Sequence, residues 1–152
     1  MRISKETIKI LDYFAELNPS IVFNKGNVIT TASPPKDVIS TCKTIDTFPI
    51  EFGIYDLITF IDNIRKMKYP KLHFPEDENE VELEGDDGSI LKYFFCDTSI
   101  VITPPKDISL ENESCNVIFE LKKEKIEKLL KMKKGIKKPI LLIKGCSKTK
   151  EI

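Results

Sequence analysis

The chain has 152 residues, of which 41% are hydrophobic and 32% charged, so it can bury an ordinary core but is more charged than an average domain. No apolar run approaches the ~18 residues of a membrane span, and the first ten residues carry charges in place of an apolar signal segment. We therefore expect a soluble, cytoplasmic protein of one domain or one and a fraction, without contact with a membrane.

The net charge is zero, but it is unevenly distributed. Residues 1–120 hold 12 basic and 21 acidic side chains, a net charge of −9, whereas residues 121–152 hold 12 basic and 3 acidic ones, a net charge of +9. Such polarity suggests a surface that attracts a polyanion in one place and repels it elsewhere. The alternative, which charge alone favours, is a solvated lysine-rich helix followed by a frayed tail.

Catalytic and metal sites are not expected. The four cysteines share no C-x-x-C spacing and accompany a single histidine, His73, so neither a zinc site nor a disulfide framework is predicted. The acidic stretch 76–87 has Glu82 where a calcium loop needs glycine. Neither glycine-rich phosphate-binding motif occurs. The sequence therefore predicts no enzyme, no metal and no cofactor.

In chain order, Ser4 is a good N-cap for a first helix that ends at Leu17, before Asn18-Pro19. Its predicted apolar face is Ile3, Thr7, Ile10, Leu11, Phe14 and Leu17, and its opposite face carries Lys5, Lys9, Asp12 and Glu16. Strands are predicted at 21–23, 28–30 and 38–43, with a hairpin turn at 24–27 between the first two.

The pattern then restarts twice. A strand at 48–55 precedes a helix at 57–68, capped by Asp56, and strands at 71–74, 81–84 and 90–96 follow. After a connector with a β-type segment at 99–103, a third copy begins with a strand at 116–121, a helix at 122–134 and a strand at 139–144. We expect a first domain at 1–98, a connector at 99–115 and a partial second domain at 116–152.

The three helices overlay. Thr7, Ile10, Leu11 and Phe14 match Leu57, Phe60, Ile61 and Ile64 at an offset of 50, and match 126, 129, 130 and 133 at a further 69, failing only at Lys133. Repeated β-α-β-β-β units predict an α+β fold with helices on one face of antiparallel sheet, and the exposed sheet edges invite partners.

Lysines lie away from the apolar faces of these helices. The predicted DNA-facing residues are Lys5, Lys9, Lys66, Lys125, Lys128 and Lys131. Lysines on a helix neutralise phosphates without reading bases, which indicates non-specific duplex contact. Alternatively, they only solvate the helix exteriors, and Asp12 and Glu16 weaken the DNA interpretation of the first helix.

The residues also resemble a known family. Met-Arg-Ile-Ser-Lys-Glu-Thr with its helix, and residues 49–64 with the Ile-Tyr-Asp-Leu entry into the second helix, resemble the sliding clamps of T-even-type bacteriophages. The order of elements through 93–103 and 119–130 agrees. The resemblance covers the first domain and the start of the second.

The resemblance implies the DNA clamp fold and a DNA polymerase processivity factor for DNA replication. Such clamps are ring homotrimers that encircle duplex DNA, tether the replicative polymerase and are opened by a clamp loader, in the cytoplasm of the infected bacterial host cell. The helix faces would then line the hole. Partner peptides bind near the connector, where Ile100, Val101 and Ile102 are the candidates, although a strand that pairs with the sheet is the alternative for them.

The second domain of such a clamp should be about as long as the first, so we expect a truncated reading frame rather than a natural short form. Two other functions compete with a clamp subunit. One is a clamp-fold adaptor that binds proteins without encircling DNA, and the other is a basic-tailed DNA-binding protein.

Overall fold

The computed structural model describes residues 1–76, 79–105 and 120–133. The chain divides into two compact units, 1–106 (unit 1) and 107–152 (unit 2), and each is described by itself. In unit 1 the elements are α1 (Lys5–Leu17), β1 (Ile21–Phe23), β2 (Gly26–Ala32), β3 (Ile39–Phe48), β4 (Phe52–Ile54), α2 (Leu57–Lys66), β5 (Lys71–His73), β6 (Glu80–Glu84), β7 (Ile90–Phe94) and the 3₁₀ turn η1 (Thr98–Ile100). Unit 2 contributes α3 (Lys123–Lys133).

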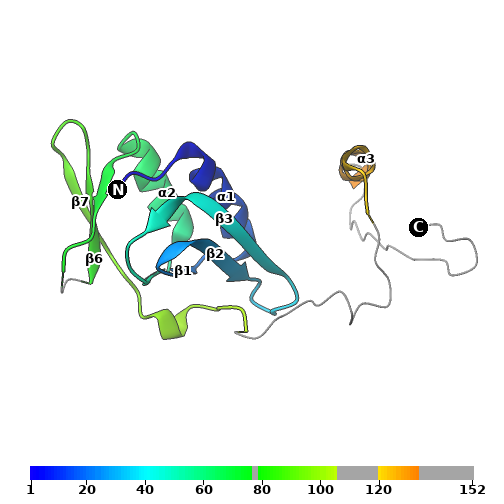
Figure 1. The fold of residues 1–152 in the computed structure, drawn as a ribbon, viewed down its shortest axis with the longest axis horizontal. Coiled ribbons are helices and arrows are strands. Elements are labelled where there is room, and N and C mark those ends of the chain that lie inside the picture. The colour runs from blue at the N-terminus through cyan, green and yellow to red at the C-terminus, as the bar shows by residue number, and fades with distance from the viewer. Residues whose placement is uncertain (77–78, 106–119, 134–152) are drawn as a thin grey trace, which may run out of the picture. The chain divides into compact units, whose positions relative to one another are not determined.

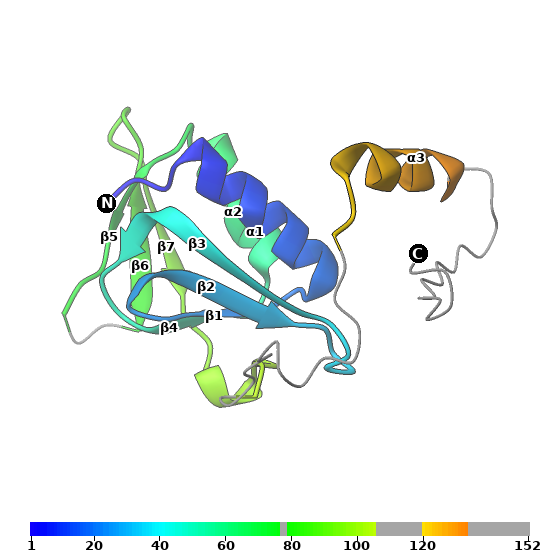
Figure 2. The same cartoon turned by 45° about the vertical axis from the view of Figure 1, so that its right-hand side comes forward.

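The strands of unit 1 form two antiparallel sheets, in the orders β3-β2-β1-β4 and β5-β6-β7. Helices α1 and α2 contact each other and pack against the sheets, as Figures 1 and 2 show. The predicted α+β class with antiparallel sheet is confirmed, and it is consistent with the sliding clamp fold. None of the helices in the described ranges has the length and apolar character of a membrane span.

The two β-α-β-β-β repeats exchange their first strands. Strand β4, which begins the second repeat, pairs with β1 of the first repeat, with Gly53 opposite Val22. In the opposite direction, the backbone of Met1 pairs with Leu72 of β5 through two hydrogen bonds of 2.6 Å. Because Val22 and Leu72 are 50 residues apart, the offset that aligns the helices also aligns these pairings.

The other edge of each first strand follows the same rule. Gly53 forms an isolated β-bridge with Cys96, and a Cβ atom at position 53 would lie 2.8 Å from the Cys96 carbonyl oxygen, so glycine permits this close approach. On the first repeat, the Ser4 amide and hydroxyl both donate to the Asp46 carboxylate at 2.8 Å. Asp46 and Cys96 are again 50 residues apart.

Aromatic rings join the two sheets in the core of unit 1. The ring of Phe23 lies 4.6 Å from the rings of Phe48 and Phe52, centroid to centroid. Phe52 in turn contacts Phe95 at 4.9 Å and Phe74 at 5.3 Å. Because Phe23 and Phe52 come from different repeats, this cluster stabilises the pairing between repeats as well as each sheet.

The helices form as predicted, with two corrections. In α1 the structure buries Ile8 and leaves Ile10 only partly buried, because α1 has apolar residues over a wider arc than one stripe. Helix α2 ends at Lys66 instead of Lys68. Lys68 and Tyr69 both adopt left-handed backbone angles, with φ of 57° and 64°, which terminate the helix.

Two predicted strands are wrong in part. The strand expected over 48–55 is divided, since Phe48 ends β3 and β4 begins at Phe52. Pro49 has no N–H to donate to a sheet ladder. The β-type segment expected over 99–103 begins instead inside η1, where the Asp97 carboxylate accepts the Ser99 N–H at 2.8 Å. Of the third repeat, residues 116–119, 134 and 139–144 lie outside the described residues, and Glu120 and Leu121 belong to no strand.

Candidate nucleic-acid interface

The capping of α1 fixes which of its side chains face solvent. The Ser4 hydroxyl oxygen accepts the Thr7 N–H at 3.1 Å and begins the helix. The buried residues of α1 are Thr7, Ile8, Leu11 and Phe14. Lys5 and Lys9, one turn apart, are exposed as predicted. The Lys5 ammonium also lies 5.6 Å from the ring centroid of Tyr69, a cation–π distance.

Helix α2 is oriented in the same way. Its N-cap, Asp56, accepts the Thr59 N–H at 2.9 Å and the Thr59 hydroxyl at 2.6 Å. The buried side of the helix is Leu57, Phe60, Ile61 and Ile64, all four as predicted. Lys66 is exposed in the last turn, where a cation also favours the helix dipole.

An ion pair joins the two helices. The Arg65 guanidinium donates to the Asp12 carboxylate at 2.5 Å, and this hydrogen bond raises the pKa of Arg65 above its ordinary value. Asp12 therefore faces α2 and is paired. Together, α1 and α2 carry four basic and four acidic side chains, so their lysines stand on a helix pair without net charge.

Helix α3 differs in charge. It carries five lysines and two glutamates, and Lys125, Lys128 and Lys131 are exposed. At 100° per residue these three lysines lie on one side of α3. Ile126 and Leu130, which lie on another side, are also exposed within the described part of the chain. Most of the positive charge of the predicted DNA-facing set therefore belongs to unit 2, whereas Lys5, Lys9 and Lys66 belong to unit 1.

The connector candidates are placed unequally. Ile100 is 58% exposed, whereas Val101 is only 5% exposed and packs into unit 1. The Asn18 side-chain amide donates to the Ile102 carbonyl at 3.1 Å and to the Ala32 carbonyl at 3.0 Å, so it attaches this segment to β2. Only Ile100 of the three offers a largely open side chain.

Two features of this surface escape sequence reasoning. Lys68 is exposed beside Lys66, but a helix predicted through Lys68 hides the left-handed turn that places it. Asn18 signals only the end of α1 in the sequence, although it is buried and holds the connector. An asparagine before proline marks a helix end, and nothing local indicates the distant carbonyl of Ile102.

The N-cap of α2 gives a pH-dependent test. Hydrogen bonds from Thr59 lower the pKa of Asp56. A lowered carboxyl pKa stabilises the fold above the unfolded pKa of ~3.9, and that contribution is lost as the pH falls through the folded pKa. We expect Asp56→Ala to cost about 1 kcal/mol at pH 7, measured by urea unfolding, and less at pH 3.

Asp56→Asn is the matched control, because asparagine caps a helix without ionising. We expect it to keep most of the stability at pH 7 and to lack the pH-dependent part. Equal losses for Asp56→Ala and for Asp62→Ala, a change in the middle of α2, would mean that the Asp56 cap has no special role.

Comparison with known proteins identifies relatives of the chain. No family model matches it. Three curated phage proteins named "Sliding clamp" do: that of Vibrio phage KVP40 is 29% identical over 132 residues, that of Escherichia phage RB69 27% over 143, and that of Enterobacteria phage T4 24% over 136. These matches cover 86%, 90% and 90% of this chain, but only 59%, 58% and 58% of the relatives. The resemblance of this chain to the phage sliding clamps is therefore confirmed over most of its length.

Proposed function

We propose that the chain is a sliding clamp subunit, a DNA polymerase processivity factor that encircles double-stranded DNA and tethers the replicative polymerase. The observation that carries this proposal is the similarity to three phage sliding clamps over 86–90% of the chain. The 50-residue repeat supports it, because two equivalent helices side by side can present one continuous surface to a duplex. The protein would have no catalytic activity of its own.

The further properties of such a clamp belong to the same proposal. A homotrimer forms the ring, with residues 1–98 and 116–152 in two domains and 99–115 between them. A clamp loader opens the ring in the cytoplasm of an infected bacterium. Lys5, Lys9, Lys66, Lys125, Lys128 and Lys131 face DNA, and Ile100 with Ile102 contributes to a partner surface near the connector.

Weak lysine contacts suit this role. Exposed lysines neutralise phosphates without base readout, so the protein moves along the duplex while the closed ring prevents dissociation. The acidic excess of residues 1–120 repels DNA from surfaces outside the hole. Retention thus comes from topology, and the charges determine where the duplex lies.

Topology also supplies the experiment. The chain is incubated with ATP, the clamp loader of one of the three phage relatives and nicked circular DNA, and bound protein is separated by gel filtration. We expect it to elute with the circle and to be released when one restriction cut linearises the DNA. Equal binding to circular and linear DNA would instead indicate a basic-tailed DNA-binding protein, and binding to neither would indicate a protein-binding adaptor. Either result would overturn the proposal.

A further inference from the structure

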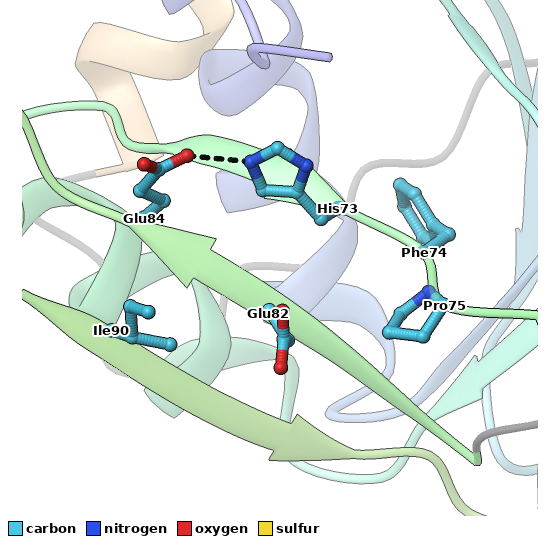
Figure 3. Close-up of a pocket in the computed structure, with 6 residues that line it drawn as sticks. All are labelled: His73, Phe74, Pro75, Glu82, Glu84 and Ile90. Carbon is cyan, nitrogen blue, oxygen red and sulfur yellow. Dashed lines mark hydrogen bonds and ion pairs between the residues drawn. The ribbon is translucent and has the colours of Figure 1, made fainter.

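A pocket of about 490 Å³ opens on the three-stranded sheet of unit 1, on the face away from α2. Its lining comes from β5 and the residues after it, and from β6 and β7: His73, Phe74, Pro75, Glu82, Glu84 and Ile90. Figure 3 shows these side chains around the opening. The pocket contains none of the lysines or connector residues of the proposed clamp function.

Strand alternation explains why polar groups gather there. In β6, Val81 and Leu83 are buried in the core, so Glu82 and Glu84 point to the opposite face. His73 lies directly opposite Glu82 in the β5–β6 register. Ile90 lies opposite Glu84 in the β6–β7 register. The four side chains therefore meet on one face of the sheet.

The hydrogen bonds leave acceptor atoms available in this pocket. His73 Nε2 donates to Glu84 Oε2 at 2.6 Å, across the diagonal between the strands, as the dashed line in Figure 3 shows. Lys92 Nζ lies 2.5 Å from Glu80 Oε1 and 3.2 Å from Glu82 Oε1. Each of these contacts uses one oxygen of Glu82 or Glu84, and a carboxylate has several lone-pair sites.

The charge of this face is negative. Three glutamates of β6, at positions 80, 82 and 84, are balanced by Lys92 of β7 and by Lys71, which stands opposite Glu84 on β5. With His73 neutral, one negative charge remains on the face. The adjoining turn adds Asp86 and Asp87, of which Asp86 pairs with Arg2 at 2.5 Å. A cationic group is therefore the complementary ligand.

The other walls are apolar. Phe74 and Pro75 follow β5, and Ile90 is 64% exposed at the start of β7. A long basic side chain has methylene groups that pack on apolar surface and a charged end that stays polar. Two carboxylates two residues apart on one strand are about 7 Å apart at their Cα atoms, which suits the broad, five-donor guanidinium group better than a compact ammonium.

We propose that this pocket binds an arginine side chain presented by a partner protein. The guanidinium donates to the free oxygens of Glu82 and Glu84, and the methylene stem packs against Pro75 and Ile90. This interaction goes beyond the proposed clamp function, since it uses a sheet face distant in sequence from the connector and involves none of the DNA-facing lysines. The charge complementarity of the pocket, with its apolar walls, determines the occupant.

The test uses a small probe and its uncharged counterpart. The ¹⁵N-labelled full chain is titrated with N-acetyl-arginine methylamide, and backbone amide shifts are followed by NMR. We expect saturable shifts at His73, Glu82, Glu84 and Ile90 with a dissociation constant in the millimolar range. N-acetyl-citrulline methylamide has the same shape without the charge, and we expect at least tenfold weaker binding.

Variants then locate the interaction. Glu82→Gln combined with Glu84→Gln should weaken arginine binding by about tenfold or more, whereas Glu16→Gln on α1 should leave it unchanged. Equal shifts with arginine and citrulline, or no shifts at these four residues with arginine, would overturn the proposal in the unaltered chain, whether or not the variants fold. Because the readout contains no DNA, its failure leaves the clamp function standing.

Discussion

Replacing Phe23 with alanine is expected to destabilise unit 1 by about 3–5 kcal/mol. The Phe23 side chain is 0% exposed, and its ring lies 4.6 Å from both Phe48 and Phe52. The smaller side chain would leave a cavity at the point where strands of the two repeats meet. Because domains are stable by only about 5–15 kcal/mol, the variant should be partly unfolded at 37 °C.

Phe94→Ala is the matched control, because Phe94 is 70% exposed on β7. The same chemical change there should cost about 0.5 kcal/mol. Guanidinium unfolding followed by circular dichroism measures both variants. If the two substitutions cost equal amounts, the aromatic cluster would not be the core that joins the repeats.

Helices were the part of this fold that local pattern could predict. The four buried residues of α2 recur at helical spacing, and Asp56 is a recognisable cap. In α1 the choice between Ile8 and Ile10 could not be made, because both fit a broad apolar arc and only contact with the sheets and α2 decides which is buried.

Strand pairing needed information that lies far away in the chain. The overlay of helices predicted a repeat, but not that Met1 pairs with Leu72, 71 residues distant, or that β4 pairs with β1. The small size of Gly53 has a meaning only beside Cys96. Such long-range pairing depends on how two repeats fit together, which single-strand periodicity does not contain.

The candidate site was predicted as a set of exposed cations, but not as a set of interactions. Exposure of Lys5, Lys9 and Lys66 follows from helix geometry once the apolar face is known. The pairing of Arg65 with Asp12 depends on the approach of α1 to α2. Likewise, the pocket beside His73 exists only because three separate strands bring their outward residues together.

The lysines allow the second large effect to be predicted. Glutamine at Lys125, Lys128 and Lys131 should lower affinity for a short linear duplex by on the order of a hundredfold at ~0.1 M salt. Each lysine that neutralises a phosphate contributes about 0.9 to the slope of log affinity against log salt, so the slope should fall by up to about 2.7. Fluorescence anisotropy over a range of salt concentrations measures both quantities.

The contrast between helices tests where the duplex lies. The triple glutamine variant at Lys5, Lys9 and Lys66 should have a smaller effect, because α1 and α2 have no net charge, whereas α3 carries five lysines and two glutamates. Glutamine at Lys25, Lys36 and Lys43, which are exposed on the hairpin and strand side of unit 1, removes the same charge. It should leave the slope unchanged. If this last variant weakened binding as much as the α3 variant, net charge rather than the helix lysines would govern DNA affinity, and the proposed lining would be wrong.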